Sequence, residues 1–214
     1  MSMIFNPADR DLTQLAVQIN YCVSCTGCQS QVKHFMQNAV LLVLFSVSIF
    51  IGTIFEFPLP GTTIMQTGQT IAVLCAGALL GPLLGAASVG LYLVLGIAGL
   101  PVFSEGASGA QVLSGPSGGY LIGFVIAAGA MGLWRNAGLM RTPVTAVPGM
   151  LLGHVVILVC GWSWMSVLMG PQAAYENGIA PFYLGSLVKS VLAALLVLAI
   201  QRLVPGGRKE LSQE

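Results

Sequence analysis

The chain has 214 residues, of which 56% are hydrophobic and only 7% are charged, and its mean hydropathy is +0.87. A soluble domain carries about 25% charged residues, so this composition excludes a soluble enzyme, a disordered chain and a disulfide scaffold. The 8 basic and 7 acidic residues nearly cancel, for a net charge of +1. Such a balance gives no electrostatic field for nucleic acid. An integral membrane protein is the class that remains.

Long stretches without a charged residue predict membrane-spanning helices. The longest runs from Phe57 to Ser104, and because one spanning helix needs about 20 mostly apolar residues, this run holds two. The Gly81-Pro82 pair marks a turn between them. The runs are continuously apolar, which favours helices over the alternating pattern of a membrane β-barrel. We therefore expect an all-α polytopic membrane protein with six transmembrane helices, at about residues 37–56, 63–81, 84–101, 118–134, 145–168 and 184–204.

The basic residues predict the orientation of these helices. All but Lys189 of the 8 Lys and Arg residues fall on the side that holds both chain ends. The loops on the opposite side contain Glu56, Glu105 and Glu176 but no Lys or Arg. Because cytoplasmic loops carry an excess of Lys and Arg, we expect both termini in the cytoplasm and the chain in the plasma (inner) membrane.

The same pattern divides the chain into three parts. We expect a cytoplasmic N-terminal extension at 1–35, a six-helix transmembrane domain at 36–205 and a cytoplasmic tail at 206–214. Within the extension, Asn6-Pro7 is typical of a helix start. A short amphipathic helix follows, because Leu12, Leu15, Ala16 and Ile19 share one face at helical spacing.

The extension also contains the one cluster with metal-ligand spacing, which is Cys22, Cys25 and Cys28 with His34 nearby. Thiolates at this spacing can bind zinc or an iron–sulfur centre. A fourth cysteine at ligand spacing is missing, which favours free thiols in a reducing cytoplasm. We therefore expect no metal and no cofactor, with a metal- or redox-sensing role as the alternative.

Lys189 is the charge that the topology does not explain. It lies about five residues into the sixth span, or ~7 Å deep at 1.5 Å per residue. It either extends to the outer headgroups or lies in an outward-facing cavity that binds an anionic group. We favour the cavity because the loop from Leu100 to Tyr120 is rich in glycine and carries Phe103 and Tyr120. Such a loop is typical of a lidded pocket for a small, partly apolar molecule.

Catalytic motifs are absent from the sequence. There is no HExxH, GxSxG or P-loop motif, so we expect neither an enzyme nor a chain that energises transport by itself. His154, in the fifth span, is interpreted as packed or hydrogen-bonded. Small residues at Gly77, Gly81 and Gly85 indicate close helix packing. Ser48-x3-Gly52 forms a similar surface on the first span, where a partner subunit has room to bind.

Three segments of the sequence resemble the BioY family, the biotin-binding S components of energy-coupling-factor (ECF) vitamin transporters. The central signature is LYLxLGxxGLPVF followed by GPxGGY, at Leu91–Phe103 and Gly115–Tyr120, after the glycine-rich stretch Ala76–Ala86. Gln69–Leu74 and Pro181–Lys189 are similar to the starts of the family's second and sixth spans. The similarity covers about residues 38–204.

The resemblance implies six helices, an outward-facing biotin site beneath the external loops, and a helical face that docks on a membrane-embedded coupling subunit with paired ATPases. Lys189 matches the family's lysine in the sixth span, and Ser48 and Gly52 correspond to the small residues used for docking. Ser117 replaces the family's threonine in GPTGGY. Ser186 stands where the family commonly has aspartate, so Glu105 or the ligand's own carboxylate would have to neutralise Lys189.

The residues fit the chemistry of biotin, whose ureido ring needs donors and acceptors and whose thiophane ring needs apolar walls. The expected function is a high-affinity biotin-binding subunit for biotin uptake, with biotin, membrane lipid, a coupling subunit and ATPases as partners and no nucleic acid. The alternatives are a stand-alone vitamin uptake facilitator and an S component for a different biotin-like substrate. The expected ligand-binding residues are Lys189, Ser186, Gln69, Phe103, Ser104, Glu105, Ser117, Gly119 and Tyr120.

Overall fold

A computed structural model describes residues 26–57 and 66–203. Contacts divide the chain into two units, residues 1–40 and residues 41–214. The second unit contains every described element after the helix α2 (Thr26–Ile54), together with the C-terminal part of α2. The site described below lies within this second unit.

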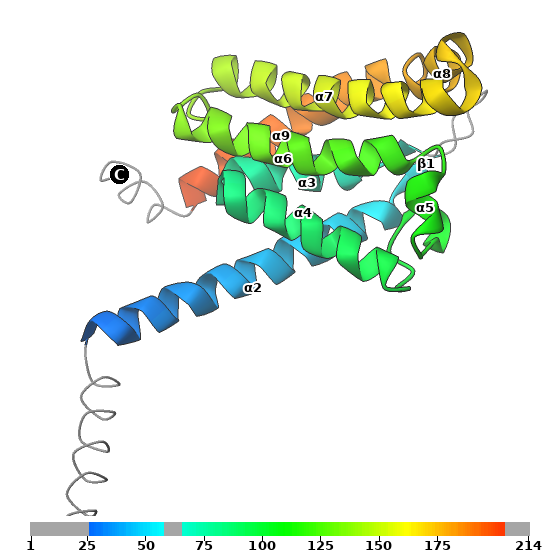
Figure 1. Ribbon diagram of the computed structural model, residues 1–214. Helices are drawn as coiled ribbons and strands as arrows, with labels where there is room; N and C mark the ends of the chain where they lie inside the picture. The colour runs from blue at the N-terminus through cyan, green and yellow to red at the C-terminus, as the bar shows by residue number, and fades with distance from the viewer. Residues whose placement is uncertain (1–25, 58–65, 204–214) are drawn as a thin grey trace, which may run out of the picture. The chain divides into compact units, whose positions relative to one another are not determined.

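The described chain is almost entirely helical (Figure 1). The strands β1 and β2 form a short antiparallel pair, with Glu56 opposite Thr67 and Phe57 opposite Gln66. In chain order the elements are α2 (Thr26–Ile54), β1 (Glu56–Phe57), β2 (Gln66–Thr67), α3 (Gln69–Leu80), α4 (Pro82–Ile97), the 3-10 turn η1 (Ser104–Gly106), α5 (Gln111–Ser114), α6 (Gly118–Asn136), α7 (Pro143–Met169), α8 (Pro171–Gly178) and α9 (Tyr183–Leu203).

The predicted spans all correspond to apolar helices, but two of those helices are short. Within the described residues, four helices are long and apolar enough to cross a membrane, at Gln31–Ile54 and in α6, α7 and α9. The helices α3 and α4 have 12 and 16 residues. A 12-residue helix is about 18 Å long, which is less than the ~30 Å of a bilayer core. The count of six spans therefore stays a prediction.

Two helix assignments differ from the sequence prediction. The helix α2 begins at Thr26, earlier than the predicted span at residue 37, because the polar residues before the apolar run continue the helix. The predicted external loop around Glu176 contains the helix α8. Its proline at the first position and the glycine before it, Gly170 with φ +88°, are typical of a helix start after a tight turn.

Helix α6 lies at the centre of the packing and contacts α3, α4 and α7 (Figure 1). Glycines permit this close approach. A Cβ on Gly77 of α3 would overlap the main-chain oxygen of Ala128 in α6, and a Cβ on Gly85 of α4 would lie 2.7 Å from the Cα of Gly77. The close-packing interpretation of this glycine motif is confirmed. The expected turn is also present, because Gly81 has φ +89° between α3 and α4.

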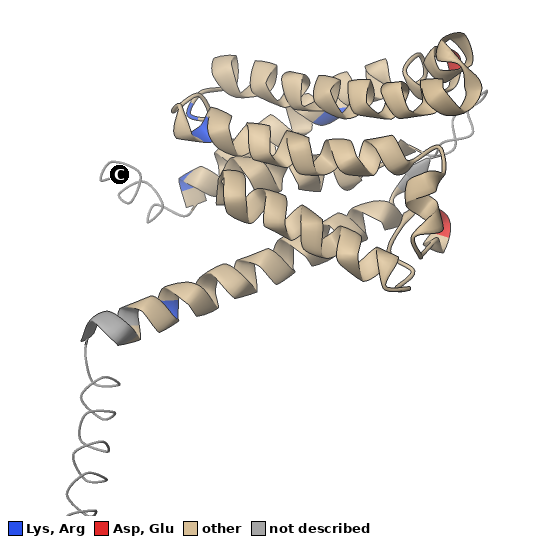
Figure 2. Cartoon of the chain, viewed as in Figure 1, with Lys and Arg blue, Asp and Glu red and all other residues tan. Residues whose placement is uncertain are grey.

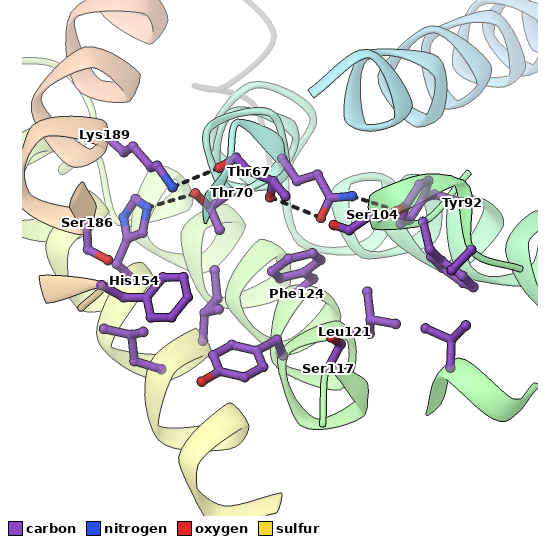
Figure 3. A pocket seen from close by; sticks show the side chains of 18 of the residues that line it. Thr67, Thr70, Tyr92, Ser104, Ser117, Leu121, Phe124, His154, Ser186 and Lys189 are labelled. Carbon is purple, nitrogen blue, oxygen red and sulfur yellow. Dashed lines mark hydrogen bonds between the residues drawn. The ribbon is translucent and has the colours of Figure 1, made fainter. Parts of the chain in front are cut away.

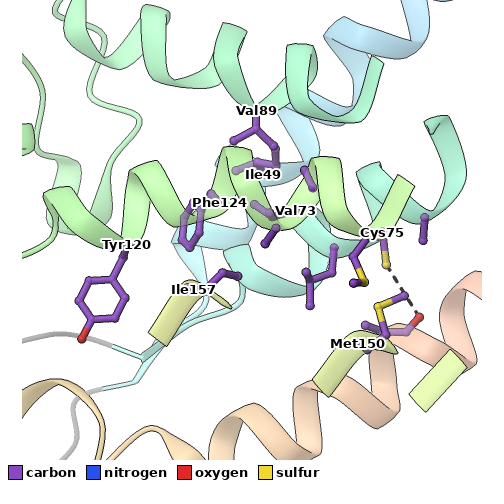
Figure 4. Packing of buried hydrophobic residues seen from close by; sticks show 14 of the residues in the cluster. Ile49, Val73, Cys75, Val89, Tyr120, Phe124, Met150 and Ile157 are labelled. Atoms are coloured by element: carbon purple, nitrogen blue, oxygen red, sulfur yellow. Dashed lines mark hydrogen bonds between the residues drawn. The ribbon is translucent and has the colours of Figure 1, made fainter. Parts of the chain in front are cut away.

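Side chains from seven helices (α2, α3, α4, α6, α7, α8 and α9) form one buried apolar cluster, part of which is drawn in Figure 4. Val73 of α3, Val89 of α4 and Ile49 of α2 are fully buried, as is Met150 of α7. The outer surface is also apolar, with exposed leucines and valines along α9 and α7. Soluble monomers rarely expose contiguous apolar surface on this scale, so the exterior fits a lipid environment.

Apart from Lys189 within α9, the charged residues of the bundle lie at its two ends (Figure 2). Arg135 and Arg202 lie in the last turns of α6 and α9, and these turns are at one end. Glu105 lies in η1 and Glu176 in α8, at the other end. This separation matches the distribution on which the predicted orientation rests.

Candidate ligand-binding site

A cavity of about 180 Å³ lies at the end of the bundle that carries η1 and α8, and extends between the helices (Figure 3). One water molecule needs only ~10–15 Å³ on this kind of measure, so the cavity has room for a small organic molecule. It is lined by Thr67, Gln69, Thr70, Tyr92, Phe103, Ser104, Glu105, Ala107, Val112, Ser117, Tyr120, Leu121, Phe124, His154, Ile157, Leu158, Phe182, Ser186 and Lys189.

The cavity brings together eight of the nine residues expected to bind a ligand. The exception is Gly119, which is buried between α6 and α7. A Cβ at Gly119 would lie 2.5 Å from the main-chain oxygen of Cys160 and would overlap the Cβ of Trp164. Gly119 therefore permits the helices to pack and does not line the cavity.

Lys189 is half-buried in α9, and its ammonium faces the protein. Nζ donates a hydrogen bond to the main-chain oxygen of Thr67 at 2.8 Å. The residue lies six positions after the start of α9 at Tyr183, or about 9 Å along the helix. The ammonium carries three donors, so two remain for a ligand after the Thr67 contact. This geometry matches the cavity prediction and differs from extension to the headgroups.

A buried histidine lies beside Lys189 on the same wall of the cavity (Figure 3). His154 of α7 is 2% exposed, and its Nε2 is 3.1 Å from the Thr70 hydroxyl. Its Nδ1 is 2.8 Å from the Ser190 hydroxyl and 3.1 Å from the Met150 main-chain oxygen. The expectation that His154 is hydrogen-bonded is confirmed, and the structure adds that it lines the cavity.

A second polar chain begins at Gln69, the first residue of α3. The Gln69 Nε2 donates to the Tyr92 hydroxyl at 2.9 Å, and that hydroxyl donates to the Val102 main-chain oxygen at 3.0 Å. The Thr67 hydroxyl is 3.4 Å from the Gln69 Oε1. These contacts hold the start of α3 against α4 and against the loop that follows α4, so the amide of Gln69 has a fixed position.

Aromatic and aliphatic side chains form the rest of the wall. Phe103 is 3% exposed and contacts the ring of Tyr92 edge to face, with the ring centroids 5.6 Å apart. Tyr120 and Phe124 follow one another by a helical turn on α6. The Tyr120 hydroxyl donates to the main-chain oxygen of Gly178 at 2.7 Å. Tyr120 is one of the residues expected to bind the ligand, and in the structure its hydroxyl attaches α6 to α8.

The loop after α4 closes one side of the cavity in a defined conformation. Gly99, Gly106 and Gly109 have positive φ angles, as expected from the glycine content of this loop. Glu105 also has a positive φ, of 57°, and its side chain is exposed. The Gly109 amide donates to the Gly96 main-chain oxygen at 2.8 Å. Such local bonds fix the loop, which suits a lid.

Several lining residues were missed from the sequence, notably Thr70, Phe124 and His154. Helical spacing would have found some of them. Ser117, Tyr120, Leu121 and Phe124 follow the i, i+3, i+4, i+7 pattern of one helix face. No comparable signal marks His154, whose inclusion depends on how α7 packs on α3 and α9.

The two residues expected at a docking surface have different surroundings. Ser48 is exposed on α2, and its hydroxyl donates to the Leu44 main-chain oxygen at 2.8 Å. A Cβ on Gly52 would lie 2.9 Å from the Cα of Gln69, and the Gly52 main-chain oxygen accepts a bond from the Gly68 amide at 2.9 Å. Gly52 is therefore a contact point within the chain, and the two residues do not share one exposed surface.

The cysteine cluster falls mostly outside the described residues. Cys22 and Cys25 lie there, as do the predicted amphipathic helix and the tail at 206–214. Cys28 lies within α2, but its side chain is not described. In the part of the chain that the structure describes, no three His, Cys, Asp or Glu side chains form a potential metal site.

Comparisons with known proteins agree with the fold and the motifs. The profile of the BioY family matches residues 24–206. A probable biotin transporter BioY from Pyrococcus horikoshii is 36% identical over 63% of this chain and 79% of the relative. Biotin transporter BioY2 from Lactococcus lactis is 30% identical over 78% of this chain and 94% of the relative. The crystal structure of the S-component for biotin from an ECF-type ABC transporter superposes with a TM-score of 0.72, at 24% identity, over 79% of this chain and 93% of that chain.

Proposed function

The chain belongs to the BioY family, and from this membership and the geometry of the cavity we propose that it is the biotin-binding membrane subunit of a biotin uptake system. The observation that carries the proposal is the convergence of Lys189, Ser186, Gln69 and Phe103 on one cavity. These residues come from distant parts of the sequence. The relatives are named transporters, in agreement with the absence of catalytic motifs.

The cavity offers the groups that biotin requires. Lys189 has free N–H donors for a carboxylate or a carbonyl oxygen, and the hydroxyls of Ser186, Ser104 and Ser117 offer further donors and acceptors. The ring of Phe103 and the aliphatic wall suit the thiophane ring. Since Ser186 carries no charge, the acceptor for Lys189 is supplied by the ligand, as its carboxylate or its ureido carbonyl oxygen.

We further propose that this subunit works with a membrane-embedded coupling subunit and ATPases. The sequence contains no P-loop, so ATP hydrolysis has to come from a partner. The exposed face of α2, with Val43, Val47, Ser48 and Ile51, is the proposed docking surface. Gly52 is excluded from that surface because it packs within the chain.

The proposed setting is the plasma membrane, with both termini in the cytoplasm. The basic end of the bundle, at Arg135, Arg141 and Arg202, then faces the cytoplasm as the positive-inside rule requires. The acidic end, with Glu105 and Glu176, faces outward, and the cavity opens toward the side from which biotin arrives.

Uptake into proteoliposomes tests the proposal. The purified chain is reconstituted alone, or with a coupling subunit and ATPases of an ECF transporter, and radiolabelled biotin is added outside. We expect ATP-dependent accumulation only with the partners. Entry of biotin through the chain alone, without ATP, would instead identify a stand-alone facilitator. No accumulation of biotin with the partners present, together with ATP-dependent accumulation of radiolabelled dethiobiotin or another vitamin, would identify a different substrate.

A further inference from the structure

We propose that His154 is a positioning residue that fixes the Thr70 hydroxyl as a hydrogen-bond acceptor, so that the cavity selects a ligand with an N–H donor at this point. The inference rests on the proposed function, because the probe for it is biotin. It depends on four hydrogen bonds at and next to one buried imidazole, and each of them has a direction that follows from its partners. The bond between His154 and Thr70 is drawn in Figure 3.

The first step concerns Nδ1 of His154. The Ser190 hydroxyl donates its single proton to the main-chain oxygen of Ser186 at 2.7 Å. The Ser190 oxygen, 2.8 Å from Nδ1, is therefore an acceptor for the imidazole. The Met150 main-chain oxygen, at 3.1 Å, is also only an acceptor. Both contacts place the proton of the ring on Nδ1.

The second step concerns Nε2. A neutral imidazole with its proton on Nδ1 has a lone pair on Nε2. The imidazole is 2% exposed and shares the cavity wall with the Lys189 ammonium, and a second buried cation beside the first would cost further solvation energy. The neutral ring therefore accepts a hydrogen bond, and the Thr70 hydroxyl, 3.1 Å away, is its donor.

The third step concerns the cavity. Thr70 has a single hydroxyl proton, which points at Nε2, so its oxygen presents only lone pairs to the other side. Thr70 lines the cavity. A ligand N–H at this position forms a bond, whereas a ligand oxygen meets another acceptor and leaves an unsatisfied polar pair. The ureido ring of biotin carries two such N–H groups. The Thr70 oxygen therefore distinguishes biotin from analogues that lack one of these N–H groups.

The experiment measures the affinities of the purified full-length chain for biotin and for the two biotins methylated on one ureido nitrogen. We expect one methylated isomer to bind at least about tenfold more weakly than biotin, because it leaves the Thr70 oxygen without a donor. The affinity ratio is the affinity for biotin divided by the affinity for this isomer. In Thr70→Val the ratio should fall to within about threefold, whereas Thr70→Ser, which keeps the hydroxyl, should retain it. The ratio for the other isomer should be the same in all these variants.

A matched pair at position 154 tests the positioning role. In His154→Gln the side-chain oxygen takes the place of Nε2 as an acceptor for Thr70, and in His154→Leu no acceptor remains. Both variants lose the Nδ1 contacts, so a merely structural role predicts the same loss in each. We expect the affinity ratio to be retained in His154→Gln and to fall severalfold in His154→Leu.

The outcomes separate the two proposals. If the wild-type chain does not bind biotin, the proposed function is wrong. If it binds biotin and binds both methylated isomers with the same affinity as biotin, the Thr70 assignment is overturned. If the ratio depends on Thr70 but is identical in His154→Gln and His154→Leu, the role of His154 is overturned. Should a position 154 variant fail to give a monodisperse peak in size-exclusion chromatography, the two Thr70 variants still decide by the same ratio whether the Thr70 oxygen accepts a hydrogen bond from the ligand.

Discussion

Lys189 in α9 donates a hydrogen bond to the main-chain oxygen of Thr67, 2.8 Å away and 122 residues earlier in the sequence. The bond connects the last helix to the strand β2 and holds the ammonium at the cavity wall. A ligand acceptor therefore meets a donor whose side chain is already ordered. Such preorganisation reduces the conformational entropy that binding would otherwise cost.

Replacing Lys189 with methionine should weaken biotin binding by about 10- to 100-fold, because a hydrogen bond from a charged donor contributes roughly 1.5–3 kcal/mol. Equilibrium binding of radiolabelled biotin to the purified variant measures the change. Arg202→Met is the matched control, since Arg202 is exposed in the last turn of the same helix. An equal affinity of both variants for biotin would show that Lys189 does not contact the ligand.

Tyr120→Phe should lower thermal stability more than it lowers affinity. The phenylalanine keeps the ring but loses the bond to the Gly178 main-chain oxygen, which leaves a buried acceptor unsatisfied at a cost of about 1–3 kcal/mol. Thermal unfolding in detergent without ligand measures the stability, and a biotin titration of the same sample measures the affinity. A large loss of affinity with unchanged stability would show that the hydroxyl contacts the ligand.

Gly119→Ala should destabilise the protein by about 1–3 kcal/mol, as overpacking of a close helix contact does. The added Cβ would overlap Trp164 and lie 2.5 Å from the Cys160 main-chain oxygen. Gly129→Ala in the same helix is the control, because nothing lies within 4 Å of a Cβ there. Thermal unfolding of the two variants compares them directly. Equal melting temperatures would mean that α6 and α7 separate at no cost.

The sequence allowed the helical class and eight of the residues that line the cavity to be predicted, for reasons that lie in local chemistry. Charge-free apolar runs locate helices because the bilayer excludes charge, and the unexplained Lys189 indicated the cavity. The sequence did not reveal His154 as a lining residue, since its position depends on contacts with Thr70 and Ser190 from other helices. The packing of Gly119 against α7 could not be predicted either, because a glycine next to lining residues has the same sequence pattern whether it faces a ligand or a neighbouring helix.

The proposed orientation predicts opposite labelling of two positions. In a chain whose 5 native cysteines are replaced by serine, Glu176→Cys should react with a membrane-impermeant maleimide added to intact cells. Arg141→Cys should react only after the membrane is permeabilised. Both side chains are exposed in the structure, so access depends on the side of the membrane. The reverse pattern would invert the topology and place the mouth of the cavity in the cytoplasm.

The central claim is that this chain binds biotin in the cavity around Lys189, and titration of the purified full-length protein with biotin tests it most directly. Calorimetry should show saturable binding of one biotin per chain. The melting temperature should rise with biotin concentration, since a ligand at 100 times its Kd stabilises the folded state by about 2.7 kcal/mol. The Lys189→Met variant should need a correspondingly higher concentration for the same rise. A wild-type protein that shows no heat of binding and no shift in melting temperature at millimolar biotin would contradict the claim.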